Sequence, residues 1–123
     1  KAMGPDGGRI IHLASVSSKI SNSKYAAYSS SKAALSQLIK VLGREWAGDR
    51  ILVNAIGPAM AENSMSESFT ADPKFKKQAL SSIPIGRFCK SEDLFGIILL
   101  LLSNSGSFIT GQTIFVDGGR TLA

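Results

Sequence analysis

The chain has 123 residues, 44% of them hydrophobic, which fits one globular unit or part of one. Its 14 Lys and Arg against 9 Asp and Glu give a net charge of +5. These residues are scattered, with no basic run and no interleaved aromatics, so a solvated surface is favoured over nucleic-acid binding. The single Cys89 excludes an internal disulfide framework and fits a reducing compartment. With no secretory signal at the start of the sequence, a cytoplasmic location is expected.

Residues 9–14 are mostly apolar and β-prone, with little alternation. That pattern predicts a strand covered on both faces, as in a parallel sheet. His12 lies in this strand without a carboxylate or cysteine partner near it in the sequence, so a packed or surface histidine is expected rather than a catalytic one. Unpaired, the strand would present an apolar edge, which proteins avoid, and we expect it to pair with another segment or chain.

A polar loop after this strand leads into a helical pattern from about Tyr25 to Ala47, with Gly48-Asp49 as its stop. The helix carries Tyr28 and, four residues later, Lys32, so that a phenol and an ammonium point into the same space. A free tyrosine holds its proton until roughly pH 10, and a nearby cation favours the phenolate. This pair predicts an acid/base device.

Other residues compete for these roles. Tyr25 is followed four positions later by Ser29 and lacks a downstream lysine. Lys24 precedes Tyr28 by four positions, but it lies at the expected helix start, where solvent weakens its field. A serine hydroxyl at the end of the preceding strand would hold a carbonyl or alcohol oxygen beside the phenol. Ser15 has that position, and Ser17 and Ser18 are its alternatives.

A second apolar strand is expected at residues 50–56, parallel to the first because a helix connects them. Residues 57–60 follow at its carboxyl end, where ligands of open α/β sheets bind. Residues 61–82 are polar, are broken by Asp72-Pro73 and contain short amphipathic pieces near residues 65–69 and 75–80.

The next helix is expected to begin at Ser91-Glu92-Asp93, with a capping serine and an acidic first turn. The apolar run at residues 94–102 is too short to cross a bilayer, so a buried helix and no membrane association are predicted. The last strand is expected at Thr113 to Val116. Asp117 follows before two glycines, which favours turn chemistry over a metal ligand. The face expected to pack on the sheet is Leu94, Ile97, Ile98, Leu101 and Leu102.

Four segments carry motifs in a fixed order. They are residues 8–15 (GRIIHLAS), followed by Tyr28 and Lys32, then 50–58 (RILVNAIGP), 83–88 (IPIGRF) and 109–119 (ITGQTIFVDGG). Together they resemble the short-chain dehydrogenase/reductase family over nearly the whole chain. The resemblance implies an α/β fold, a Rossmann-like doubly wound parallel sheet, of which this chain is the C-terminal portion only. The family's glycine-rich phosphate turn and its catalytic asparagine, which belong to the N-terminal half, are not found in this sequence.

The resemblance also implies a domain organisation and site roles. Residues 1–123 would be the C-terminal part of a single NAD(P)-binding domain, with a substrate lid at about 59–83. Ser15, Tyr28 and Lys32 would be catalytic, and no metal is expected. The residues implied to bind NAD or NADP are Tyr28, Lys32, Pro58, Ala59, Met60 and Asn63. Ala59 stands where the family usually has glycine, and Asn63 stands near a family threonine.

The expected activity is the interconversion of a small-molecule carbonyl and a secondary alcohol by hydride transfer, with Tyr28 as general acid/base. The family's use of the long helix in subunit contacts implies a homo-oligomer, a dimer or tetramer. An alternative follows from the missing phosphate turn: a non-catalytic oligomerisation or interaction fragment of such an enzyme. Met60, Met65 and Phe69 are candidates to line a substrate pocket, and packing beneath a loop explains them equally well.

Overall fold

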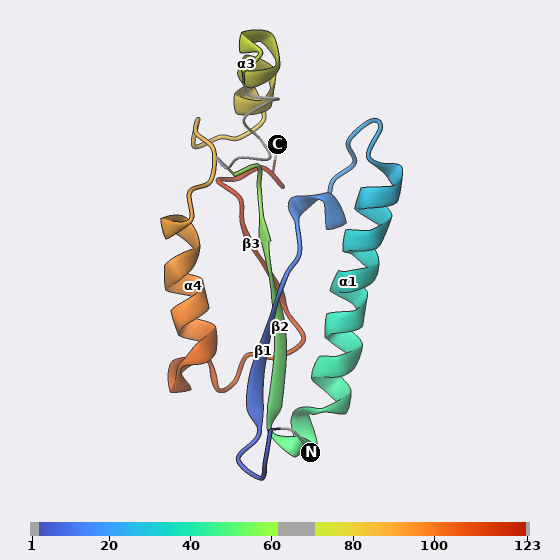
Figure 1. Cartoon of the computed structure of the whole chain (residues 1–123), viewed down its shortest axis with the longest axis vertical. Coiled ribbons are helices and arrows are strands. Elements are labelled where there is room, and N and C mark those ends of the chain that lie inside the picture. The colour runs from blue at the N-terminus through green and yellow to red at the C-terminus, as the bar shows by residue number, and fades with distance from the viewer. Residues whose placement is uncertain (1–2, 62–70, 123) are drawn as a thin grey trace.

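A three-stranded parallel sheet forms the centre of the molecule, with the strands in the order β1-β2-β3 (Figure 1). The structure, a computed structural model, describes residues 3–61 and 71–122. The strands are β1 (Gly8–Leu13), β2 (Ile51–Pro58) and β3 (Thr113–Val116). The α-helices are α1 (Ala26–Glu45), α3 (Pro73–Ser81) and α4 (Glu92–Leu102), and short 3₁₀ turns are η1 (Val16–Ser18), η2 (Ala47–Asp49) and η3 (Asn104–Gly106). This arrangement confirms the α/β class and the parallel sheet.

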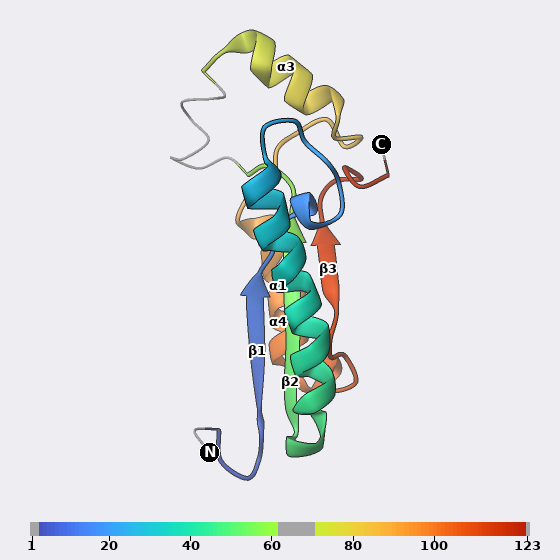
Figure 2. The ribbon, with the colours of Figure 1, turned by 90° about the vertical axis from the view of Figure 1, so that its right-hand side faces the viewer.

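The layers follow from the apolar faces of the two longer helices. Figures 1 and 2 show α1 on one face of the sheet and α4 on the other, with α3 beyond the carboxyl ends of the strands. The central strand β2 is the most buried, because it has a strand on each side and a helix on each face. Ile39 of α1 packs there against Val53 and Ala55, and Ala14 completes this cluster. The loops that follow the three strands lie together at the carboxyl ends of the sheet (Figure 1).

Two element boundaries differ from the prediction by two residues, and the others by no more than one. The long helix ends at Glu45 rather than near Ala47, because the chain tightens into η2 and Arg50 then adopts a left-handed backbone with φ 60°. Strand β2 continues two residues past Ile56, since Gly57 and Pro58 pair with Phe115 and Val116 of β3. The predicted bounds of β3 are confirmed.

Helix α1 and the loop before β3 approach closely at a pair of glycines. A Cβ at Gly43 would lie 2.5 Å from the backbone nitrogen of Gly111, so no larger residue fits without a shift. Asn54 on β2 is 2% exposed, yet its amide donates to the Ile109 carbonyl at 2.8 Å and its Oδ1 accepts the Gln112 N–H at 3.0 Å. Both polar atoms of the buried side chain therefore have a partner, and the two bonds hold the loop that leads into β3.

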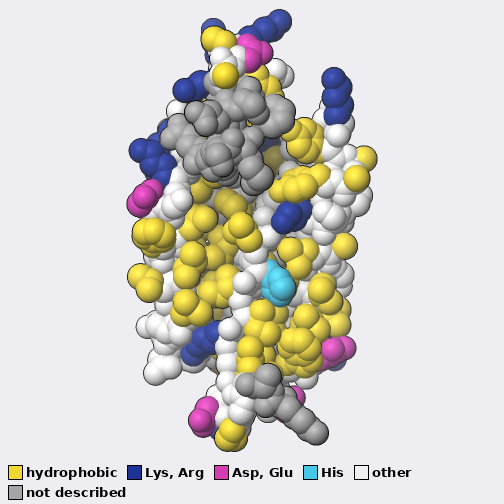
Figure 3. Space-filling view, in the orientation of Figure 1, with side chains coloured by type: hydrophobic (Ala, Val, Ile, Leu, Met, Phe, Trp, Pro, Cys, Tyr) yellow, Lys and Arg dark blue, Asp and Glu magenta, His cyan; other side chains and the backbone are white. Residues whose placement is uncertain are grey.

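Helix α4 is less buried than predicted. Leu94, Ile97 and Ile98 are partly buried and Leu101 is 2% exposed, as expected for a face on the sheet, but Leu102 is 53% exposed. The outward residues Phe95 and Leu99 are 55% and 67% exposed. Periodicity identifies the face of a helix but not what covers its other side. Figure 3 shows hydrophobic side chains gathered over α4 and the neighbouring strand edge.

The start of α4 also corrects a prediction. Ser91 makes no side-chain capping hydrogen bond. Instead the Asp93 carboxylate accepts the backbone N–H of Lys90 at 2.8 Å, while Glu92 and Asp93 place the expected negative charge in the first turn. No helix within residues 3–61 and 71–122 is long and apolar enough to cross a membrane.

Strand β1 lies at an edge of the sheet, with one side paired to β2 from Gly8 to Leu13. Gly8 N–H donates to Arg50 and Ala14 N–H to Ile56, so the amides of Arg9, Ile11 and Leu13 point to the open side. We expect these three amides to be protected in the full-length protein by pairing with another segment or chain. Hydrogen exchange measures this, and rapid exchange at all three in a folded monomer would contradict the pairing.

Candidate active site

Tyr28 and Lys32 lie on one face of α1 within its first two turns. The N-terminal end of this helix lies near the carboxyl ends of the strands (Figure 1). The Lys32 ammonium is 5.7 Å from the centre of the Tyr28 ring and donates a hydrogen bond to the carbonyl of Leu13 at 2.9 Å. That carbonyl ends β1, so the lysine joins the first turns of the helix to the strand that precedes Ser15. The Tyr28 side chain is 45% exposed. The structure thus places a cation beside an accessible phenol, as helical spacing predicts.

Ser15 follows β1 and caps the turn η1, which lies beside the N-terminal part of α1 (Figure 1). It is 8% exposed, and its Oγ accepts the backbone N–H of Ser17 at 3.1 Å. Ser18 donates its hydroxyl to the Ser15 carbonyl at 2.8 Å. Because a hydroxyl both accepts and donates, the Ser15 Oγ–H proton stays available after the capping bond is made. Of the two alternatives, Ser18 uses its hydroxyl within the turn, whereas Ser17, 8% exposed, contributes its backbone N–H to it.

The two competitors on the tyrosine side have different surroundings. Tyr25 caps α1 at its N-terminus, and its ring meets the Tyr28 ring edge-on, with centroids 6.2 Å apart. Lys24 is exposed, with a left-handed backbone at φ 71°. His12 is partly buried in β1.

The loop after β2 begins at the same edge of the sheet. Pro58 is partly buried, Ala59 is 8% exposed and Met60 is partly buried, while Asn63 lies outside the described residues, as do Met65 and Phe69. Ala59 is not among the residues with a positive φ, so the replacement of the family's glycine does not strain the backbone. The Met60 carbonyl accepts the Cys89 N–H at 3.0 Å, which ties the loop to the segment before α4.

Gly57 is required by packing rather than by backbone conformation. A Cβ there would lie 2.6 Å from the ring of Phe115, and the next nearest group is the backbone of Ser15 at 3.5 Å. The ammonium of Lys19, which follows η1, lies 5.6 Å from the centre of the Phe115 ring. The aromatic ring thus fills the space between the loop carrying Ser15 and the end of β2.

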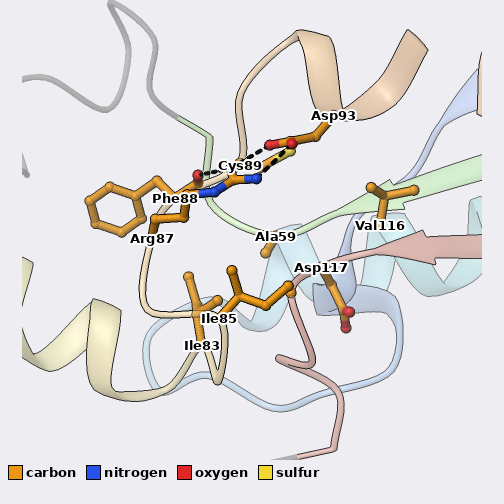
Figure 4. A pocket seen from close by; sticks show the side chains of 10 residues that line it. Ala59, Ile83, Ile85, Arg87, Phe88, Cys89, Asp93, Val116 and Asp117 are labelled. Carbon is orange, nitrogen blue, oxygen red and sulfur yellow. Dashed lines mark hydrogen bonds and ion pairs between the residues drawn. The ribbon is translucent and has the colours of Figure 1, made fainter. Parts of the chain in front are cut away.

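A small pocket of about 170 Å³ opens beside Ala59, in the loop after β2 (Figure 4). Its walls are mainly apolar, and an ion pair stands at one side. Arg87 donates both guanidinium nitrogens to the Asp93 carboxylate, at 2.6 and 2.7 Å, a paired geometry with high directional specificity. The lining residues are Ala59, Ile83, Ile85, Arg87, Phe88, Cys89, Asp93, Val116, Asp117 and Gly118.

Hydrogen bonding decides the protonation of the acidic groups around this pocket. The Arg87 guanidinium holds the pKa of Asp93 well below its usual range, and the backbone N–H of Lys90 acts in the same direction. Burial acts to raise the pKa of Asp117, but hydrogen bonds from Thr121 and Gly119 outweigh it and the pKa is lowered. Burial raises the pKa of the Cys89 thiol. Both carboxylates are therefore anionic at neutral pH, and the thiol keeps its proton.

Asp117 behaves as the sequence predicts. Its carboxylate accepts the backbone N–H groups of Gly119 at 3.0 Å and Thr121 at 2.8 Å, which is turn chemistry. Among the described residues, no group of three or more His, Cys, Asp or Glu side chains is arranged to hold a metal ion.

One contact at the site has no signal in the sequence. Arg120, in the turn after β3, donates to the side-chain oxygen of Asn22 at 3.2 Å. Asn22 lies in the loop between Ser15 and Tyr28, 98 residues earlier in the chain. No local pattern predicts such a pair, because only the packing of β3 beside β2 brings the two loops together.

Comparison with known proteins supplies the family. A family model described as enoyl-(acyl carrier protein) reductase matches residues 1–121. A tropinone reductase homolog of Arabidopsis thaliana is 41% identical over 115 residues, which cover 94% of this chain and 43% of that protein. A 3-oxoacyl-(acyl-carrier-protein) reductase of Thermotoga maritima is 39% identical over 115 residues, covering 94% of this chain and 46% of the relative.

Solved structures agree. The crystal structure of a gluconate 5-dehydrogenase from Burkholderia cenocepacia, in complex with NADP and tartrate, superimposes with a TM-score of 0.93 at 31% identity and covers 98% of this chain and 48% of that one. The chain belongs to the short-chain dehydrogenase/reductase family. It spans less than half the length of the curated relatives just compared.

Proposed function

We propose that this chain is part of an NAD(P)-dependent oxidoreductase that interconverts a carbonyl and a secondary alcohol. The observation that carries the proposal is the placement of Tyr28 and Lys32 on one face of α1, with the phenol accessible and the ammonium 5.7 Å from its ring. The family supports it, because three of the solved relatives are described with NADP.

The roles follow from the chemistry of each group. Tyr28 gives its Oη proton to the substrate oxygen in reduction and takes it back in oxidation. Lys32 stabilises the phenolate, since a nearby positive charge favours the ionised form. Ser15 donates its free Oγ–H to the same substrate oxygen and orients it. A bound nicotinamide supplies or accepts the hydride.

The described residues fit such a cofactor. An ammonium has three donors, and Lys32 uses one for the Leu13 carbonyl, which leaves two for ribose hydroxyls. Tyr28 is the second residue proposed to bind the cofactor. Pro58, Ala59 and Met60 stand at the carboxyl end of β2, where ligands of open α/β sheets bind, and Asn63 is proposed to join them.

We propose that residues 1–123 are the C-terminal part of a single cofactor-binding domain, with residues 59–83 as a lid over the substrate. The open side of β1 supports this, because an apolar edge needs a partner. A mainly apolar groove beside this edge supports the same proposal. Its lining residues are Ile11, His12, Leu13, Ile56, Ile98 and Leu102. Residues 62–70 of the proposed lid are not among the described residues.

We further propose a homo-oligomer, a dimer or tetramer, located in the cytoplasm. Leu38 and Val41 expose 47% and 41% of their surface on the outer side of α1, and a free thiol at Cys89 suits a reducing compartment. Sedimentation of the full-length protein as a monomer would contradict the assembly.

Titration with NADH and with NADPH, followed by nicotinamide fluorescence, tests the cofactor. We expect the full-length protein to bind at least one of them saturably and 1:1. Lys32→Ala should weaken that binding by about tenfold, because two hydrogen bonds to the ribose, each contributing about 0.5–1.5 kcal/mol, are lost. Lys40→Ala, on the same helix, is the control. Absence of binding to either cofactor would contradict the proposed function and favour the alternative, a non-catalytic role in oligomerisation or interaction.

A further inference from the structure

The turn after β3 contacts two segments that flank the proposed site. On one side it packs on the residues that follow the proposed lid: Ile85 N–H donates to the Gly118 carbonyl at 3.1 Å. A Cβ at Gly118 would lie 2.9 Å from Ile83, and one at Gly119 would lie 3.0 Å from Pro84. Their φ values are 60° and 85°, so both the limited space and the backbone conformation require glycine at these two positions.

On its other side the same turn reaches the loop before Tyr28. Arg120 Nη2 donates to Asn22 Oδ1 at 3.2 Å, and both side chains are partly buried. The turn that presents Arg120 is itself fixed, since Arg120 N–H donates to the Asp117 carbonyl and the Asp117 carboxylate accepts two further backbone N–H groups. The backbone that carries Arg120 is therefore fixed by the turn, and its guanidinium is held by the bond to Asn22.

Asn22 leads directly to the start of α1. Its carbonyl accepts the Tyr25 N–H at 3.2 Å, and the Tyr25 carbonyl accepts the Ser29 N–H at 2.7 Å, which is the first bond of the helix. Tyr25 also meets Tyr28 ring to ring at 6.2 Å. A displacement of Asn22 thus changes the N-terminal turn of α1, where Tyr28 stands.

We propose that Arg120 is a positioning residue that ties the loop before Tyr28 to the segment after the lid, so that the placement of the phenol depends on the turn after β3. The proposal rests on the proposed function of Tyr28. Arg120 acts through Asn22 and is assigned no contact with substrate. Because a displacement of about 1 Å at a reacting group costs up to about 10²-fold in rate, a tether of this kind affects turnover without touching the chemistry.

The test combines hydrogen exchange and kinetics in the full-length protein. Arg120→Ala and Asn22→Ala should each speed exchange at the amides of Tyr25 and Ser29 by at least about fivefold and lower kcat by about tenfold, with KM within about threefold. The double variant should be no worse than either single one. Asn22→Asp, which keeps the acceptor oxygen, should retain the protection.

Arg44→Ala is the matched control, since it removes the same charge from an exposed position near the other end of α1. It should leave exchange at Tyr25 and Ser29 unchanged. Unaltered exchange in Arg120→Ala, or effects of the two single changes that multiply, would overturn the tether. A wild-type protein that binds cofactor but turns over no carbonyl or alcohol would overturn the proposed function instead, and the exchange result would still decide whether the tether exists.

Discussion

Tyr28→Phe is expected to lower kcat of the full-length enzyme by about 10²–10⁴-fold, the usual contribution of a positioned general acid/base. That loss corresponds to about 3–5 kcal/mol of transition-state stabilisation. The substitution removes only the hydroxyl of a side chain that is 45% exposed, so the free energy of unfolding should change by no more than about 0.5 kcal/mol. Steady-state kinetics and chemical unfolding of the same preparation measure the two effects separately.

Tyr25→Phe is the matched control for this change. It removes the same hydroxyl three residues earlier and keeps the edge-on ring contact with Tyr28. Tyr25 has Ser29 rather than a lysine four residues later, so its phenol has no cation on the same helix face downstream. We expect kcat of this variant within about threefold of the wild type. Retention of more than a tenth of the activity by Tyr28→Phe would contradict the role of the phenol.

The fold was largely predictable because its strands and helices are marked by local patterns. Apolar, β-prone runs predicted all three strands, and helical spacing predicted α1 and four of the five residues expected on the sheet-facing side of α4, Leu102 being the exception. Two errors at α4 have physical causes. Periodicity does not reveal whether a second layer covers Phe95 and Leu99, and the choice of Asp93 over Ser91 as the group that accepts a backbone N–H depends on where Arg87 holds the carboxylate.

The candidate site was predictable only where sequence spacing fixes geometry. Tyr28 and Lys32 share a face because they are four residues apart on a helix, and this follows from the helix alone. The bond from Lys32 to the Leu13 carbonyl and that from Arg120 to Asn22 join segments far apart in the chain. These contacts depend on how the helix and the strands pack, which no local pattern specifies.

Ile39→Ala is expected to lower the free energy of unfolding by about 2–5 kcal/mol, the range for truncating a fully buried isoleucine. Ile39 is 0% exposed and packs on Val53 and Ala55 of β2 and on Ala14 after β1. The buried neighbours Ala14, Val53 and Ala55 are short, so none of them reaches far into the space left by the truncation. Urea unfolding of the full-length protein, followed by circular dichroism, measures the loss as a lower midpoint with an unchanged slope.

Lys40→Ala, one position along the same helix, separates burial from helix propensity. Lys40 is exposed, and alanine is the best helix former, so the free energy of unfolding of this variant should stay within about 0.5 kcal/mol of the wild type.

The two substitutions differ in the face of α1 that they alter, and only the Ile39 change opens a cavity between the helix and the central strand. Since β2 is held by a strand on each side, the sheet is poorly able to collapse into that space. A loss below about 1 kcal/mol for Ile39→Ala would show that α1 moves freely over the sheet. Such freedom would be incompatible with a helix that fixes a phenol for proton transfer.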